Sequence, residues 1–238
     1  MDVRFPIAIL YFSRNARQEA TAKSWLGHRS SRNETIAKAL IDRTACTLQA
    51  TGLPVFRFHE GNQQGETFGE KLVHAYQALF EQGFEAVISV GNDTPDLDQV
   101  DWDQIAERLA RGELIIGPTV RGGTYLMGLT QSAFDAEQFL ELPWQSRHLC
   151  EALVTSLHEA GHFLHELPHF RDLNSLQDLF RYIREHVQRD STRRLLHRLL
   201  GSSATDTRVS GFRIWPILLT FPPFRGPPCP HSQPPKLQ

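Results

Sequence analysis

Short apolar runs alternate along this chain with longer segments whose apolar residues recur at helical spacing, and this alternation restricts the possible folds more than any other feature. The runs at 7–12, 53–58 and 86–90 have the length and composition of buried strands. Helical spacing follows two of them, at 33–51 and 67–80. Strands that alternate with helices predict a mostly parallel sheet with helices on both faces and right-handed crossovers.

The alternation continues as far as residue 187. Further strands are predicted at 114–116, 124–129 and 162–167, and further helices at 102–110, 149–160 and 176–187. The chain has 238 residues, of which 40% are hydrophobic, and this is enough for one substantial core. We therefore expect a single α/β domain over residues 1–201.

The end of the chain has a different composition. From Pro216 onward proline dominates, and no hydrophobic period is present that would bury one face of a helix or strand. Residues 202–238 are therefore predicted to form a proline-rich tail with little regular structure. The alternative is a segment that docks a partner through Trp215, Phe221 and Phe224.

Charge and cysteine content exclude several classes of partner. A net charge of −2 provides no basic surface for nucleic acid, and no apolar run is long enough to span a membrane. The three cysteines are odd in number and widely spaced, which argues against a disulfide framework. The first residues do not have the pattern of a signal peptide. These features predict a cytoplasmic protein that binds neither nucleic acid nor a membrane.

The strand predicted at 86–90 ends in a turn that carries a carboxylate. Gly91 allows a sharp turn, Pro95 prevents a return to regular structure, and Asp93 lies between them. Ligands of open α/β sheets bind beyond the carboxyl ends of the strands, so Asp93 is placed to hold a metal ion against a phosphate. A turn in which Asp93 bonds only backbone amides is an equal alternative.

Two later segments add polar groups at predicted strand ends. In the segment 117–129, Gly122 and Gly123 would allow a close backbone approach to a ligand, or would simply form a tight turn. In the segment 172–179, Asp172 is a candidate second metal ligand, whereas Asn174 or Ser175 would also serve as a helix cap.

Taken in order, these segments resemble a known family. The matching motifs are Gly-Asn-Asp-Thr-Pro-Asp-Leu at 91–97, Gly-Pro-x-x-x-Gly-Gly-x-Tyr-Leu-x-Gly-Leu at 117–129, Leu-Pro-Trp at 142–144 and Asp-Leu-Asn-Ser-x-x-Asp-Leu at 172–179. Residues 65–72 match as well, with Lys71 where arginine is usual. The chain is similar to bacterial transferase-like proteins catalogued as a domain of unknown function, of the selenodomain- or arsenosugar-associated type. That family resembles glycosyltransferases of the nucleotide-diphospho-sugar transferase (GT-A) fold and, more distantly, cofactor nucleotidyltransferases.

The resemblance implies a three-layer α/β/α, Rossmann-like domain that binds a nucleoside diphosphate sugar or a nucleoside triphosphate and transfers a group to a small-molecule acceptor. It implies that Mg²⁺ or Mn²⁺ bridges protein carboxylates and the diphosphate, and no zinc is expected. Asp93 and Asp172 would be the catalytic residues and, with Asn174, the metal ligands. The nucleotide and its phosphates would contact Arg14, Arg17, Lys23, Gly91 and Asn92. The acceptor would contact Glu70, Arg121, Gly122, Gly123, Thr124, Tyr125 and Trp144, although Trp144 is as easily a packing residue.

Three departures from the family pattern bear on activity. The glycine-containing basic loop after the first strand is replaced by residues 13–23, where Arg14, Arg17 and Lys23 provide cations or simply a solvated helix face. Arg121 stands where the family has an aspartate. Asn174 replaces the second aspartate of the later motif, which keeps an oxygen ligand but removes a charge. A non-catalytic relative that binds a nucleotide or a partner is therefore the alternative function.

A third hypothesis comes from a zinc-binding pattern. Residues 158–162 read His-Glu-x-x-His, which in metalloproteases places both histidines on one face of a helix and uses the glutamate to activate a metal-bound water. Gly161 is typical of a helix end, and the residues after it favour a strand. If the helix stops there, His158 and His162 do not share a face, so a zinc peptidase is the least favoured function.

Overall fold

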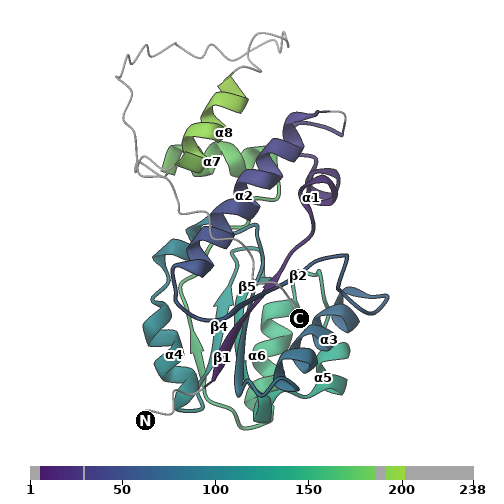
Figure 1. The fold of residues 1–238 in the computed structure, drawn as a ribbon, viewed down its shortest axis with the longest axis vertical. Helices are drawn as coiled ribbons and strands as arrows, with labels where there is room; N and C mark the ends of the chain where they lie inside the picture. The colour runs from purple at the N-terminus through teal and green to yellow at the C-terminus, as the bar shows by residue number, and fades with distance from the viewer. Residues whose placement is uncertain (1–5, 29, 186–190, 202–238) are drawn as a thin grey trace, which may run out of the picture.

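Six strands form one sheet at the centre of the computed structural model, which describes residues 6–28, 30–185 and 191–201 (Figure 1). The strands are β1 (Ile7–Phe12), β2 (Val55–Phe58), β3 (Ala86–Val90), β4 (Leu114–Pro118), β5 (Thr124–Thr130) and β6 (Leu164–Glu166). Their order across the sheet is β2-β1-β3-β5-β4-β6. β1 pairs in parallel with β2 and β3, and β4 pairs in parallel with β6, whereas β5 is antiparallel to both of its neighbours. The expected mostly parallel sheet is confirmed.

Most of the expected helices form close to their predicted bounds. The helices are α1 (Ala16–Lys23), α2 (Arg32–Gln49), α3 (Phe68–Phe80), α4 (Trp102–Ala110), α5 (Ala136–Leu140), α6 (Leu149–Glu159), α7 (Leu176–Glu185) and α8 (Ser191–Gly201). Two 3-10 helices are present in the described residues, at Pro95–Gln99 and Gln131–Ala133. The prediction that Pro95 prevents regular structure is wrong, because proline is well tolerated at the first position of a helix and begins one here. The sequence prediction did not include α5 or α8, and it described the segment of α1 as a loop. The predicted tail at 202–238 lies outside the described residues.

Alternate residues of each strand point to opposite faces of the sheet and build two separate cores. In β1, Ala8 and Leu10 pack on one face with α3, α5 and α6. Ile7 and Ile9 pack on the other face with α2 and α4. Figure 1 shows these two sets of helices on either side of the sheet. The three-layer α/β/α arrangement is therefore confirmed.

A third core joins helices beyond the edge of the sheet. It contains buried residues of α1, α2, α7 and α8, among them Ala20, Ile36, Leu179 and Leu196. We call α1, α7, α8 and the first half of α2 the helical cap, which forms the upper part of the molecule in Figure 1. Because α1 follows β1 and α7 follows the loop after β6, the cap stands at the carboxyl ends of these strands.

Strand directions bring several polar loops to the same edge of the sheet. β1, β3 and β4 end at this edge, and the antiparallel β5 begins there. The residues after β1, after β3 and between β4 and β5 are therefore neighbours in space.

None of the helices in the described part of the chain is long and apolar enough to span a membrane. The cytoplasmic location stays a prediction.

Candidate functional site

A cavity of about 1000 Å³ opens at the edge where β1, β3 and β4 end. Its walls come from the loop after β1, the loop after β3, the β4–β5 hairpin, the start of α3, the segment 144–149 and the segment before α7. Of the residues predicted for the site, it is lined by Arg14, Lys23, Gly91, Asn92, Asp93, Arg121, Gly123, Thr124, Tyr125, Trp144, Asp172 and Asn174.

Asp93 and Asp172 lie in neighbouring segments of this cavity. The backbone N–H of Leu173 donates to the carbonyl of Asp93 at 2.8 Å, so the loop after β3 and the segment before α7 are directly joined. The buried indole of Trp25, just after α1, donates to the carbonyl of Leu173 at 2.7 Å. These two bonds hold together parts of the sheet edge and the helical cap that are far apart in sequence.

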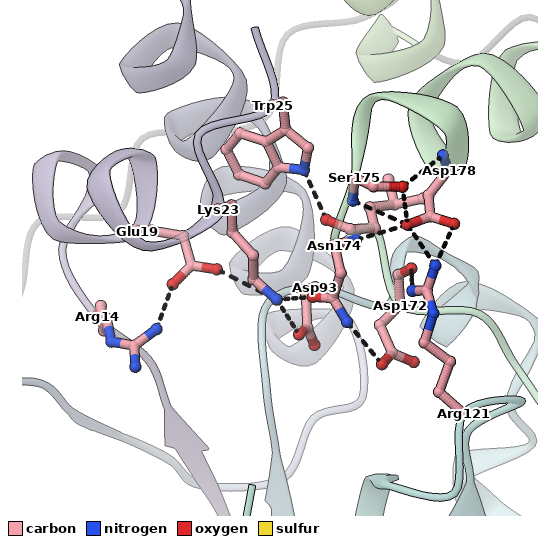
Figure 2. Close-up of polar contacts among 11 residues, drawn as sticks. Arg14, Glu19, Lys23, Trp25, Asp93, Arg121, Asp172, Asn174, Ser175 and Asp178 are labelled. Carbon is pink, nitrogen blue, oxygen red and sulfur yellow. Dashed lines mark hydrogen bonds and ion pairs between the residues drawn. The ribbon is translucent and has the colours of Figure 1, made fainter. Parts of the chain in front are cut away.

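The ammonium group of Lys23 lies between the acidic residues. It donates to Oδ2 of Asp93 at 2.9 Å and to Oδ1 of Asn174, and Oε1 of Glu19 lies 3.9 Å away on the preceding turn of α1 (Figure 2). Burial by itself lowers the pKa of Lys23, but the carboxylates of Asp93 and Glu19 more than offset this and raise the pKa. Lys23 is therefore charged at neutral pH.

Asp172 is incompletely satisfied. Its Oδ2 accepts from Nδ2 of Asn174 at 3.0 Å, whereas its buried Oδ1 has no partner in hydrogen-bond geometry among the described residues. Burial and then the nearby charge of Asp93 raise the pKa of Asp172, although Lys23, Arg121 and the neighbouring hydroxyl of Thr119 act in the opposite direction. A buried polar atom without a partner is costly, so this oxygen is available to a ligand.

The donors proposed for a divalent cation fit such an ion in chemical type, and all of them line the cavity. Asp93, Asp172 and Asn174 supply oxygen atoms, which Mg²⁺ and Mn²⁺ prefer. The ammonium of Lys23 between two of them indicates that the surrounding field favours a positive charge. No group of three His, Cys, Asp or Glu side chains within the described ranges is arranged to hold a metal ion. The donor set therefore depends on the asparagine amide.

Arg121, which was predicted to lie beside the acceptor, forms a structural ion pair. Its Nη2 donates to both carboxylate oxygens of Asp178, at 2.7 and 2.8 Å, and its Nη1 donates to the carbonyl of Asp172 (Figure 2). Burial of Asp178 raises its pKa, but hydrogen bonds from Arg121 and Ser175 outweigh this and hold the pKa below its ordinary value. The arginine therefore fastens the β4–β5 hairpin to the start of α7.

The polar residues of the segment 172–178 have two roles: some cap the start of α7, and others face the cavity. Ser175 caps α7, because its hydroxyl accepts from the N–H of Asp178 at 3.2 Å while Asp178 accepts from the N–H groups of Asn174 and Ser175. The side chain of Asn174 instead contacts Lys23 and Asp172. Of the two cap candidates, only Ser175 acts through its side chain, and Asn174 is left for the cavity.

Arg14 and Asn92 both line the cavity, but they differ in solvent exposure and in hydrogen bonding. The exposed guanidinium of Arg14 lies 3.5 Å from Glu19. Asn92 is buried, and its Nδ2 has no hydrogen-bond partner in the part of the chain that the structure describes. Arg17 is exposed on α1 and does not line this cavity, because α1 turns it away from the side that carries Glu19 and Lys23.

An aromatic wall closes another part of the cavity. Trp144 packs against Phe68 with ring centroids 5.6 Å apart, and Phe12 meets Phe68 edge-on at 5.4 Å. The indole N–H of Trp144 donates to the carbonyl of Phe139 at 2.7 Å, and a Cβ on Gly69 would stand 2.7 Å from its ring. Trp144 is therefore both a packing residue and a wall of the cavity.

Three residues predicted for the acceptor have mainly structural positions. Glu70 forms a capping box with Thr67 and accepts from the N–H groups of Glu66 and Thr67, which lowers its pKa and turns it away from the cavity. Gly122, with a φ of 83°, faces the carbonyl of Arg147, where a Cβ would collide. Tyr125 is buried and stacks on Phe170, although part of it reaches the cavity.

Sequence reasoning missed several residues of the site. Glu19 is buried beside Lys23 and Arg14, and its i,i+4 spacing to Lys23 was the available signal, hidden because the segment was treated as a loop. Burial raises the pKa of Glu19, with Lys23 opposing the rise and Asp93 adding to it. Phe68 and Lys71 line the cavity and lie in the segment 65–72 that resembles the family, but they were not assigned to the site; Arg147 lines it without any local pattern that marks it.

The His-Glu-x-x-His segment lacks the geometry of a zinc site. α6 ends at Glu159, and Gly161 has a φ of 80°, so His162 lies outside the helix that carries His158. The two histidines therefore do not stand at successive turns of one helix, which the peptidase mechanism requires.

Comparison with known proteins gives a family and a fold. The model of a family described as "Uncharacterized protein conserved in bacteria (DUF2064)" matches residues 18–146, which confirms the resemblance inferred from the sequence. No curated protein matches the chain. A provisionally assigned nucleotide-diphospho-sugar transferase from Desulfovibrio desulfuricans G20 shares the fold, with a TM-score of 0.73 and 20% identity over 84% of this chain and 97% of that one.

Two other solved structures are more distant. A cytidylyltransferase from Leptospira borgpetersenii serovar Hardjo-bovis has a TM-score of 0.41 and 15% identity over 88% of this chain and 99% of its own. The protein Rv0371c from Mycobacterium tuberculosis H37Rv, in complex with manganese, has a TM-score of 0.40 and 15% identity over 76% of this chain and 99% of its own.

Proposed function

The chain belongs to this bacterial family (DUF2064), and from that premise we propose that it is a nucleotide-sugar or nucleotidyl transferase that uses Mg²⁺ or Mn²⁺ and a small-molecule acceptor. The observation that carries the proposal is the joining of Asp93 to the Asp172–Asn174 segment in a cavity at the carboxyl ends of the strands. Ligands of open α/β sheets bind at this edge.

The residues divide into three roles under this proposal. Asp93, Asp172 and Asn174 hold the cation, which neutralises charge on the departing diphosphate when it is bound. Arg14 and Lys23 face the phosphates, and the free amide N–H of Asn92 is a donor for the nucleotide. The aromatic wall of Phe12, Phe68 and Trp144 excludes water on the acceptor side.

Either form of the reaction releases a diphosphate group. In glycosyl transfer, an acceptor hydroxyl oxygen forms a bond to the anomeric carbon, the bond from that carbon to the nucleoside diphosphate breaks, and the hydroxyl proton passes to solvent. In nucleotidyl transfer, an acceptor oxygen forms a bond to the α-phosphorus of a nucleoside triphosphate, the bond from that phosphorus to the bridging oxygen of the β-phosphate breaks, and inorganic diphosphate leaves while any acceptor proton passes to solvent. Because negative charge grows on the leaving group in both, the cations around this cavity stabilise the same change.

A thermal-shift panel of nucleoside diphosphates, triphosphates and diphosphate sugars, with and without Mn²⁺, tests the proposal. We expect a stabilising nucleotide whose effect depends on Mn²⁺ and is lost in Asp93→Ala. Asp42→Ala, at an exposed ion pair of α2, is the matched control and keeps the effect. If no nucleotide stabilises the protein under either condition, the proposal is wrong. Binding of a nucleotide with no transfer to any acceptor supports the non-catalytic alternative, for which the loss of the family's aspartate at Arg121 is the motive.

A further inference from the structure

The ammonium of Lys23 occupies the point where the proposed metal donors meet. It donates to Asp93 Oδ2 and to Asn174 Oδ1, which are two of the three side chains assigned to the cation. A divalent ion would need these same oxygen atoms. The ammonium and the ion therefore cannot both use them.

Lys23 is held at this point by the fold around it. Its side chain is only 15% exposed, compared with 69% for Lys38 in a surface ion pair. Ser24, with a φ of 47°, ends α1 directly after Lys23. The indole N–H of the following residue, Trp25, donates to the carbonyl of Leu173 and so anchors this end of α1. An ammonium tethered so closely acts at a high effective concentration against any free cation.

The charge balance also depends on Lys23. The carboxylates of Asp93 and Glu19 lie 2.9 and 3.9 Å from its ammonium, and the more distant charge of Asp172 adds to the rise of its pKa. The side chain of Glu19 is only 4% exposed. Arg14 contacts Glu19 from the solvent side, so Lys23 is the cation inside the cluster among the described residues. Without a positive charge at this position, three carboxyl groups would repel one another in a partly buried site.

We propose that Lys23 is the resident counter-ion of this acidic cluster, and that Mg²⁺ or Mn²⁺ binds only by displacing its ammonium from Asp93 and Asn174. The proposal rests on the metal ligands named under the proposed function. Once displaced, the ammonium stays within the same cavity, where a nucleotide diphosphate provides an anionic partner. Metal and nucleotide then strengthen each other's binding, because each relieves the charge that the other leaves unpaired.

Titration with Mn²⁺ alone, followed by the electron paramagnetic resonance signal of the free ion, tests this without any nucleotide. We expect Lys23→Met to bind Mn²⁺ at least tenfold more tightly than the wild type. Lys23→Arg keeps a cation and is expected to remain within about threefold of the wild type, as is Lys38→Met, the matched surface control. Equal affinity of the wild type and Lys23→Met, whether tight, weak or undetectable, overturns the proposal.

A second measurement uses only the wild-type protein and does not depend on how well a variant folds. An amine-reactive reagent, with peptide mass spectrometry, compares the labelling of Lys23 with that of Lys38. We expect saturating Mn²⁺ to accelerate labelling of Lys23 at least threefold and to leave Lys38 unchanged. Unchanged or slower labelling of Lys23 contradicts displacement.

The two proposals fail separately. If Lys23→Met gains affinity for Mn²⁺ and no nucleotide stabilises either protein, the counter-ion role stands and the transferase proposal is wrong. If nucleotides bind with Mn²⁺ while Lys23→Met and the wild type hold Mn²⁺ equally, the counter-ion role is wrong and the transferase proposal stands.

Discussion

Two ion clusters join the sheet edge to the helical cap, and they differ in how fully their polar atoms are paired. In the Arg121–Asp178 cluster, both carboxylate oxygens accept hydrogen bonds and the serine cap completes the set. In the Lys23 cluster, Asp93 and Glu19 share one internal ammonium, and Asp172 Oδ1 has no hydrogen-bond partner among the described residues. The fully paired cluster is structural, whereas the incompletely paired one has an oxygen that can accept a further hydrogen bond or a cation.

The pKa directions follow the same division. Asp178 has a lowered pKa, so its charged form stabilises the fold above the ordinary carboxyl range. Glu19 and Asp172 have raised pKa values, so their charged forms oppose folding at neutral pH. A cation that binds beside Glu19 and Asp172 would therefore offset the cost of their charged forms. A cation beside Asp178 would not stabilise the fold further, because Arg121 already pairs with that carboxylate.

The largest effect is expected from breaking the complete cluster. Arg121→Ala leaves the buried carboxylate of Asp178 without its guanidinium and should lower the free energy of unfolding by about 2 kcal/mol, the range for hydrogen bonds to charged groups. Urea denaturation with and without Mn²⁺ measures it, and Mn²⁺ should not restore the loss. Arg111→Ala, in an exposed pair with Glu113, should change stability by less than about 0.5 kcal/mol. Recovery with Mn²⁺ would remove the distinction between the clusters.

A smaller loss is expected from Lys23→Met at pH 7. The variant removes the counter-ion but also removes the cost of burying an ammonium, so we expect a loss below the roughly 2 kcal/mol of Arg121→Ala. Unlike the loss in Arg121→Ala, it should be restored by Mn²⁺ and should shrink as falling pH protonates Glu19 and Asp172. Denaturation at pH 7 and pH 5 measures it. A loss that grows toward pH 5 would contradict the charge argument.

The smallest effect, with the opposite sign, is expected from Asp172→Asn. Because the pKa of Asp172 is raised in the fold, its charge destabilises the protein above that pKa, so the variant should be slightly more stable than the wild type at pH 7. The gain should disappear as the pH falls through the folded pKa, where the wild-type carboxyl takes up its proton. The same variant should bind Mn²⁺ less tightly. Lower stability than the wild type at pH 7 would show that the Asp172 charge has a partner that this account omits.

Local pattern predicted most of the framework of the molecule. The runs that became β1, β3, β4 and β5 are bounded by turn residues, and Thr67 with Glu70 forms a cap that depends only on neighbours in the chain. α1 was missed because its apolar residues are few, and its contacts with the rest of the cap hold it in place.

The roles of the site residues were less predictable, as Arg121 and Glu70 illustrate. The sequence predicted that Arg121 places an unusual positive charge beside the acceptor, but in the structure its guanidinium pairs with Asp178. Glu70 looked like a site residue, but the start of its own helix uses it. In both cases the residue type gave the charge of the side chain, but the sequence did not show which group that charge pairs with.

The sequence by itself determined the order of strands and helices, the turn that carries Asp93 and the set of polar residues near it, because these depend on contacts within a few residues. Only the tertiary structure decided that the loop of Asp93 is joined to the segment of Asp172, that Lys23 lies between Asp93 and Asn174, and that Asp178 pairs with Arg121. The reason is physical: the interaction energy of a charge depends on its distance to other charges and on burial, and the packing of the cap against the sheet fixes both.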